Sequence, residues 1–290
     1  IAGLRAGDRV CIDNSWALAL QTYHRHQLPT PDYCGWQQFR DAQGQPRYPQ
    51  REVLIGPIGA SGTAGSVPEG RITGKMLVIE CLMDIDALAW QADWYRDKVR
   101  EALGTDFENQ FALWFVDHAQ HDNPHTLAAH ARTINFSGVL QQGLRDLAAW
   151  VERGVRPHDT RYRVDDAQVV LPDGAAERGG IQPVVELRVN GELRAEVACG
   201  DAVSFTARLA VPPDAGSLVA AEWDFEGSGR YPLRETLAAG QAQLRLSATH
   251  VYAQAGTYFA VLRVISQRDG DAQTPYARIP NLARVRVVVH

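Results

Sequence analysis

The sequence predicts two architectures in succession, an α/β segment with a parallel sheet and then an all-β sandwich. In the first half, apolar runs of strand length alternate with stretches of helical periodicity, as in parallel strands joined by crossover helices. From residue 183 onward, apolar residues alternate singly with polar ones between Gly, Asp and Pro turns, as in a sandwich. A stretch rich in Pro, Gly and charge separates the two patterns. We therefore expect domains at 1–160 and 183–290, with a linker at 161–182.

The first half contains two buried-strand patterns and two helix patterns. Residues 75–81 (KMLVIEC) and 111–116 (FALWFV) are near-continuous apolar runs, as strands covered on both faces require. Residues 90–103 predict a helix that ends at Gly104, and residues 139–153 predict an amphipathic helix that ends at Gly154. Further patterns indicate a strand at 9–13, a helix at 16–26 and an apolar run at 52–58.

The second half repeats the period of two that half-buried strands show. The alternating runs lie at 185–189, 203–207, 244–248, 258–264 and 285–289. Their even spacing and short turns predict one sandwich domain that extends to the last residue.

Composition excludes several protein classes. The 290 residues are 45% hydrophobic and 22% charged, which is ordinary for a folded domain. No apolar run reaches the roughly 20 residues that span a bilayer, so we expect no transmembrane segment. The formal net charge of −5 argues against a broad electrostatic surface for nucleic acid, so we expect no nucleic-acid partner.

The cysteine and histidine spacings favour neither a metal nor a cofactor. Cys11, Cys34, Cys81 and Cys199 form no CxxC pair. His121, His125 and His130 have the spacing of ligands on a helix, but Pro124 interrupts any helix there. We therefore expect no cofactor and no bound metal.

The second half resembles the PKD (polycystic-kidney-disease) domain. Residues 222–227 (EWDFEG), 250–252 (HVY) and 255–258 (AGTY) match that family's W-D-F-G-D-G, H-x-Y and P-G-T-Y motifs in order and spacing. The resemblance implies an immunoglobulin-like sandwich over about 183–290 and an extracellular setting. We expect Trp223 and Tyr258 to be core aromatics and Asp224 to organise a turn.

The first half resembles the C-terminal half of an α/β-hydrolase. The run from Gly74 to Ile79 leads to Asp84 and Asp86, and residues 111–116 lead to 117–121 (DHAQH). The resemblance implies that a late strand presents a triad acid from its carboxyl end, and that the next strand presents the triad histidine on the following loop. It also implies that the helix at 139–153 packs on the sheet.

Two acids and two histidines compete for these roles. Asp84 lies where the family's Gly-Thr-x-Asp turn places the acid, whereas Asp86 begins a stretch similar to the D-x-L-V-P that normally follows the acid. His121 falls where the family's G-x-G-H turn ends, and His118 is the alternative. We favour Asp84 and His121, with Asp86 and His118 as alternatives. Without a catalytic role, these side chains would be solvated loop groups or the N-cap of the helix near Trp90.

The chemistry of such a triad explains why these residue types are needed. A serine hydroxyl is a poor nucleophile until an imidazole takes its proton, and the imidazole needs a carboxylate that holds its tautomer and stabilises its cation. The serine normally sits in a G-x-S-x-G elbow, which is missing here. Ser15 follows a strand pattern, but Asp13 stands where the strained turn needs a small residue.

The chain also opens as if within a domain, with Ile1-Ala2-Gly3-Leu4-Arg5. We therefore expect the nucleophile on an upstream segment or a companion chain. The sequence thus predicts the C-terminal portion of a secreted serine hydrolase that cleaves an ester, or an amide, through an acyl-enzyme. Its substrate would be a small or polymeric ester. The alternative is a non-catalytic extracellular binding or adhesion protein with a degenerate hydrolase-like half.

Overall fold

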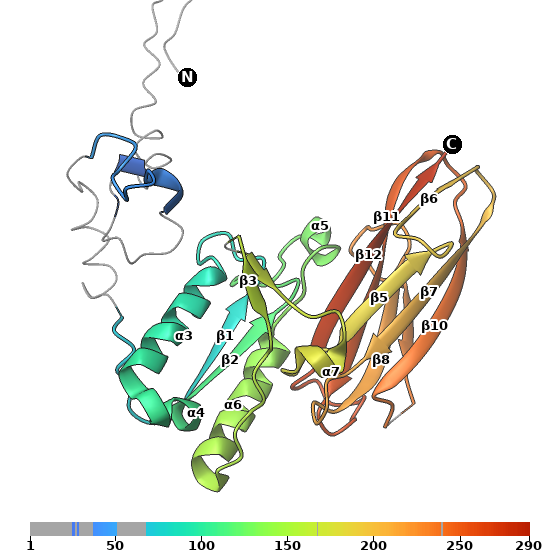
Figure 1. Cartoon of the computed structure of the whole chain (residues 1–290). Coiled ribbons are helices and arrows are strands. Elements are labelled where there is room, and N and C mark those ends of the chain that lie inside the picture. The colour runs from blue at the N-terminus through green and yellow to red at the C-terminus, as the bar shows by residue number, and fades with distance from the viewer. Residues whose placement is uncertain (1–24, 27, 29–36, 51–67, 167, 239) are drawn as a thin grey trace, which may run out of the picture. The chain divides into compact units, whose positions relative to one another are not determined.

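The computed structural model in Figure 1 describes residues 25–26, 28, 37–50, 68–166, 168–238 and 240–290. The chain divides into two compact units, Ile1–Val67 and Pro68–His290. In the first unit, a 3-10 helix at Gln37–Phe39 precedes a β-bridge between Arg40 and Pro46. The patterns expected at 9–13, 52–58 and most of 16–26 lie outside the described residues, as do Ser15, Cys11 and Cys34.

Two parallel strands begin the second unit. β1 (Met76–Cys81) and β2 (Phe111–Val116) pair in register, from Met76 opposite Phe111 to Cys81 opposite Val116. All six residues of β2 are buried, as its unbroken apolar sequence requires.

Helices cover both faces of this strand pair (Figure 1). α3 (Trp90–Leu103) packs with Phe111, Leu113 and Phe115 on one face. α6 (Ser137–Arg153) packs on the other face, where Gly143 approaches the side chains of Ile79 and Trp114. An alanine methyl group at position 143 would lie 2.8 Å from Ile79 Cδ1, so the close approach of α6 to β1 depends on this glycine. Neither Asp84 nor Asp86 caps α3, whose first turn has no side-chain cap.

The prediction of an α/β-hydrolase sheet is wrong, because most of the regular structure belongs to the mainly antiparallel sheets of a β-sandwich. Among the described residues, the parallel sheet consists of β1 and β2 alone. Side chains close the outer edge of β2, where the amides of Leu113 and Phe115 donate to Asp159 Oδ1 and Thr160 Oγ1. The amide of Asp117 donates to Gln182 Oε1 in the same way. These side-chain acceptors occupy the positions at which a further strand would pair.

Two larger sheets form the second half of the molecule (Figure 1). A three-stranded sheet has the order β10-β7-β5, and a five-stranded sheet has the order β6-β12-β11-β8-β9. Neighbouring strands are antiparallel except for β12 and β6. The strands are β5 (Val184–Val189), β6 (Arg194–Val197), β7 (Ala202–Ala210), β8 (Ser217–Asp224), β9 (Leu233–Thr236), β10 (Gln243–Val251), β11 (Gly256–Gln267) and β12 (Ile279–Val289).

The alternating sequence of each strand explains the sandwich core. In β7 the buried residues are Val203, Phe205, Ala207 and Leu209, and the residues between them are exposed. Phe205 meets the fully buried Trp223 of β8 edge-on, with ring centroids 6.3 Å apart. The same core continues into the first half of the unit and includes Trp114, so the strand pair and the sandwich share apolar packing.

Asp224 organises the turn that follows β8, as expected from its motif. Its side chain is buried, and its carboxylate accepts hydrogen bonds from the Gly229 amide at 2.6 Å and from Ser228 Oγ at 3.1 Å. Tyr252 is also buried and donates to the carbonyl of Phe225 at 2.9 Å. The Tyr258 hydroxyl donates to the carbonyl of Gln254, and its ring stacks on Tyr252. The motif residues Asp224, Tyr252 and Tyr258 therefore serve turn geometry and packing.

Short elements connect these layers. They are a 3-10 helix at Gly104–Asp106, α4 (Phe107–Gln110), α5 (Leu127–His130), β3 (Arg163–Asp165), β4 (Gln168–Val170) and α7 (Ala175–Arg178). None of the described helices is long and apolar enough to cross a bilayer.

Candidate active site

The candidate site forms where β1 and β2 end. Because the strands are parallel, their carboxyl ends meet at one edge, and the chain leaving β1 is bonded to the chain leaving β2. The Leu82 amide donates to the Val116 carbonyl, and the Met83 amide donates to the Ala119 carbonyl, both at 2.9 Å. These two backbone hydrogen bonds hold the two loops together, so that Asp84 and His121 lie in contact.

Asp84 is a buried carboxylate fixed by its own turn. Its side chain is 3% exposed. Oδ1 accepts hydrogen bonds from the amides of Asp86 at 2.9 Å and Ala87 at 3.0 Å. The Asp84 amide donates to the Cys81 carbonyl at 3.2 Å. The carboxylate is thus held by backbone donors before any imidazole reaches it.

His121 pairs with this carboxylate through one ring nitrogen. Nδ1 lies 2.8 Å from Asp84 Oδ2 and 2.9 Å from Oδ1. A carboxylate only accepts hydrogen bonds, so Nδ1 carries the proton and donates, and the neutral ring has a free lone pair on Nε2. The His121 side chain is 48% exposed, so Nε2 can be reached from solvent.

The competing residues lie elsewhere or are less well placed. Asp86 Oδ2 is 3.8 Å from His121 Nε2, and Asp122 Oδ2 is 3.7 Å from the same atom. Both acids are about three-quarters exposed, so they are solvated neighbours of the ring and not its anchor. Of the two predicted acids, Asp84 is therefore the one that the structure bonds to His121.

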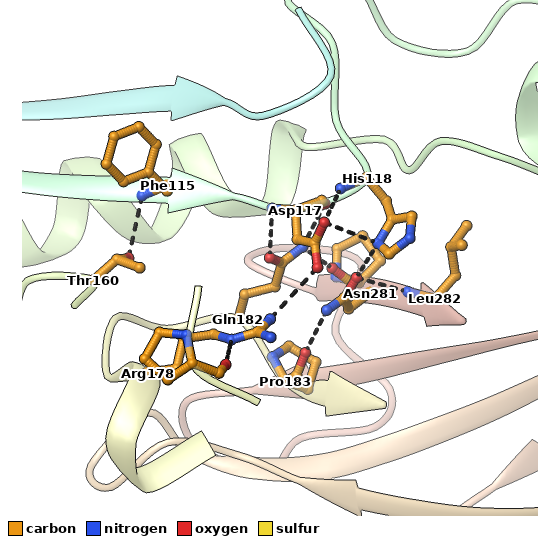
Figure 2. A network of polar contacts seen from close by, with 11 residues as sticks. Phe115, Asp117, His118, Thr160, Arg178, Gln182, Pro183, Asn281 and Leu282 are labelled. Atoms are coloured by element: carbon orange, nitrogen blue, oxygen red, sulfur yellow. Dashed lines mark hydrogen bonds and ion pairs between the residues drawn. The ribbon is translucent and has the colours of Figure 1, made fainter. Parts of the chain in front are cut away.

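His118 belongs to a different network, shown in Figure 2. Its Nδ1 lies 3.1 Å from Asn281 Oδ1 on β12 and 3.3 Å from Asp117 Oδ1. It has a positive φ of 55°, which turns the chain between β2 and the rest of the loop. Among the described residues, no contact of His118 with Asp84 or Asp86 is found.

Gln182 holds the same network together. It is 5% exposed and uses both ends of its amide. Oε1 accepts from the Asp117 amide, and Nε2 donates to the carbonyls of Asp117 and Pro280. Asn281 Nδ2 donates to the Pro183 carbonyl at 2.7 Å (Figure 2). These contacts fix the histidine loop to the sandwich, and none of them involves Asp84.

The charges around the pair set its proton affinities. Burial by itself raises the pKa of Asp84, but the hydrogen bonds from the Asp86 amide, His121 and the Ala87 amide outweigh it, and the pKa lies below its usual value. The hydrogen bond to Asp84, and then its negative charge, raise the pKa of His121 above its usual value. The charges of Asp122 and Asp86 add to this increase.

Sequence reasoning missed Glu80, next to the site on β1. Burial and the charge of Asp84 raise the pKa of Glu80 to about 7. Burial and the charges of Glu80 and Asp84 raise the pKa of the free, buried Cys81 thiol to about 12, so it stays protonated at neutral pH and is a poor nucleophile. The signal that could have identified Glu80 is a lone Glu inside an otherwise apolar strand pattern.

The pair can act as a general base. Asp84 fixes the orientation and tautomer of the ring, and Nε2 can take a proton from a hydroxyl group placed near it.

Comparison with known families locates one domain in the chain. The PKD domain family matches residues 186–275, so the resemblance noted in the sequence is confirmed for that region. The match runs from β5 to the segment before β12 and does not reach Asp84 or His121. A search of curated proteins found no match.

Three solved structures with some likeness each align with only about a third of this chain. The CARDB domain of the PF1109 protein from Pyrococcus furiosus, crystallised with di-metal ions, is 15% identical over 37% of this chain and 92% of that one, with a TM-score of 0.27. The solution structure of the same domain gives the same identity and TM-score over 95% of its length. A Niemann-Pick type C2 protein from Japanese carpenter ant is 6% identical over 36% of this chain and 89% of that one, with a TM-score of 0.22. At these scores the likeness carries no argument about function.

Proposed function

We propose that this chain is part of a secreted serine hydrolase and supplies the acid and the histidine of its triad. The observation that carries the proposal is the 2.8 Å contact of His121 Nδ1 with the buried Asp84 carboxylate, while the half-exposed ring leaves Nε2 accessible. The substrate class that fits is an ester, and an amide is the harder variant of the same reaction. An extracellular location is supported by the PKD domain, since such domains are typically extracellular.

In the proposed reaction, His121 first accepts a proton and then returns it, in acylation and again in deacylation. His121 Nε2 takes the proton of a serine hydroxyl as its oxygen attacks the ester carbonyl, and Asp84 stabilises the imidazolium that forms. The bond to the leaving alcohol breaks, and the imidazolium returns the proton to that alcohol. Water then attacks the acyl-enzyme with the same base, and the acid product and free serine are released.

The nucleophile in this proposal lies outside the described residues, on another segment or a companion chain. Two features of the second unit support a companion. Among the described residues, β1 pairs on one side only, and its sequence, apolar except for the partly buried Glu80, includes no Lys or Pro that would deter a further strand. One face of α6 and the turn after it also expose a row of apolar side chains, namely Leu140, Leu144, Val151 and Val155.

A fluorophosphonate probe tests the proposal on the native preparation. We expect one serine to be labelled, and peptide mapping of every chain would identify it. His121→Ala should slow labelling by about a thousandfold or more, because the general base is lost. His125→Ala, a change at an exposed histidine of the same loop, should leave the rate unchanged.

Three outcomes would overturn the proposal. Absence of label on every chain would favour the extracellular binding protein instead. Equal loss in the His121 and His125 variants would mean that the loop and not the base is needed. Labelling that survives His121→Ala at the original rate would remove the pair from the chemistry.

A further inference from the structure

A second polar feature lies along the outer edge of β2, away from the Asp84–His121 pair. It is a cavity of about 460 Å³ beside the segment that leaves α6. Its charged lining comprises Arg96, Arg156, Arg161, His158, Asp159 and Asp214. A second cavity of about 290 Å³ shares Arg156, His158 and Asp214 with it and adds Arg153, Arg268 and Asp146, the last two of which form an ion pair at 2.8 Å. The larger volume is that of a small-molecule site, for which about 300–1,000 Å³ is typical.

Backbone hydrogen bonds hold the segment that lines this cavity in place. The amide of Thr160 donates to the Leu113 carbonyl on β2, and the amide of Arg161 donates to the Arg178 carbonyl at 2.7 Å. Gly180 has a φ of +65°, and a Cβ atom there would lie 2.5 Å from Thr160 Oγ1. Only glycine allows this approach, so the strand-like segment at 159–161 is clamped between β2 and the chain after α7. The lining arginines therefore project from a preorganised wall.

The charges in the cavity do not cancel. Both carboxylate oxygens of Asp159 already have partners, because Oδ1 accepts a hydrogen bond from the Leu113 amide and Oδ2 accepts one from Arg156 at 2.7 Å. Asp214 lies 3.6 Å from His158. Among the described residues, neither Arg161 nor Arg96 has an ion-pair partner, although the net charge of the whole chain is −5.

Arg96 is held in place without being neutralised by direct contact. Its Nη1 donates to the Tyr162 hydroxyl at 3.1 Å, and the guanidinium lies over that ring, 5.5 Å from its centre. The Tyr162 hydroxyl in turn donates to Asp93 at 2.6 Å. The remaining donors of Arg96 stay available, as do those of Arg161.

We propose that this cavity binds a small molecule through a carboxylate or phosphate group, which Arg96 and Arg161 would contact. Guanidinium groups suit both anions, because their paired N–H donors match two oxygens of either one. The site is distinct from the Asp84–His121 pair, so the inference stands whether or not the chain acts as a hydrolase.

Isothermal titration with glucuronate and with inorganic phosphate tests the proposal on the full chain. We expect saturable binding of at least one of them, weakened by added salt because the contact is ionic. Binding of glucuronate alone would identify the ligand as a carboxylate, and binding of phosphate alone would identify it as a phosphate ester. Glucose serves as the uncharged probe and should not bind.

Arg161→Gln is the decisive variant, because this exposed side chain can be changed with little risk to folding. It should weaken binding by about tenfold or more, the loss expected for a charge-assisted hydrogen bond. Arg163→Gln is the matched control, since Arg163 is two residues away, outside the cavity and paired with Asp165. The proposal is overturned if neither anion binds saturably, or if both variants reduce binding equally.

Discussion

His118 and His121 stand three residues apart in one loop, yet their surroundings are opposite. His118 faces Asn281 on β12 and is part of the network that joins the loop to the sandwich. His121 faces the buried Asp84 at the end of β1 and leaves its second nitrogen accessible. The positive φ of His118 separates the two directions. The first histidine therefore anchors the loop to the sandwich, whereas the second one has an accessible ring nitrogen, which the proposed function uses as a base.

The largest effect that would test this contrast concerns the two acids near His121. We expect Asp84→Asn to slow probe labelling by roughly a thousandfold to ten-thousandfold, because an amide favours the wrong tautomer of the ring. Asp86→Asn should change the rate by less than about threefold, since its carboxylate is solvated and 3.8 Å from Nε2. Labelling rates of the two variants compare them directly. Equal effects would show that the anchor was assigned to the wrong acid.

A smaller effect is expected on the other side of the loop. Gln182→Ala removes three hydrogen bonds, two from the half-buried backbone of Asp117 and one from the buried carbonyl of Pro280. We expect it to lower the free energy of unfolding by about 1–3 kcal/mol. Urea unfolding measures the loss, and Gln273→Ala at an exposed position should change it by less than about 0.5 kcal/mol.

The same variant also sharpens the comparison of the two histidines. Under conditions where Gln182→Ala stays folded, its labelling rate should remain within about tenfold of the wild type, because the Asp84–His121 contact does not pass through it. A loss as large as that of Asp84→Asn would mean that the two networks act as one.

The smallest effect is a shift along the pH axis. In the proposed reaction neutral imidazole is the base, and the pKa of His121 is raised, so the labelling rate should rise with pH through a midpoint above 6.5. Asp122→Asn removes a negative charge 3.7 Å from Nε2 and should lower that midpoint by less than about one pH unit. A midpoint below 6.5 in the wild type would contradict the pairing with Asp84.

The pKa of Asp84 also ties the pair to stability at low pH. Because this pKa lies below 3.8, the contribution of the carboxylate is fully present above 3.8 and is lost as pH falls through the lowered value. The raised pKa of His121 acts in the other direction, since its contribution is present below 6.5 and is lost as pH rises through the higher value.

The sandwich strands were the most predictable part of the molecule. Their signal is local, because alternation at positions such as Val203, Phe205 and Ala207 reports which face is buried. The Trp223-Asp224 motif added the family, which the comparison confirmed over 186–275. Such information is contained in a few neighbouring residues and needs no knowledge of distant partners.

The fold class of the first half was predicted wrongly because its sheet is limited by distant side chains. Apolar runs indicate that a strand is buried, but they do not say how many strands lie beside it. Asp159 and Thr160 close the edge of β2 from more than 40 residues away. The sequence predicted that Asp84 and His121 would lie together, because each follows a strand, and the structure brings them into contact. The contacts of Gln182 and Asn281 could not be predicted, since they join segments far apart in the sequence.

The closed edge of β2 has a consequence for self-assembly. A sheet that can be extended on both sides can propagate into a filament, as in cross-β fibres. Here the acceptors from Asp159, Thr160 and Gln182 leave the described strand pair extendable only through β1. If two copies met through β1, each would use its single open edge and the association would end as an isologous pair. The described two-stranded sheet could thus recruit one partner by strand addition through β1, and it would then have no open edge left.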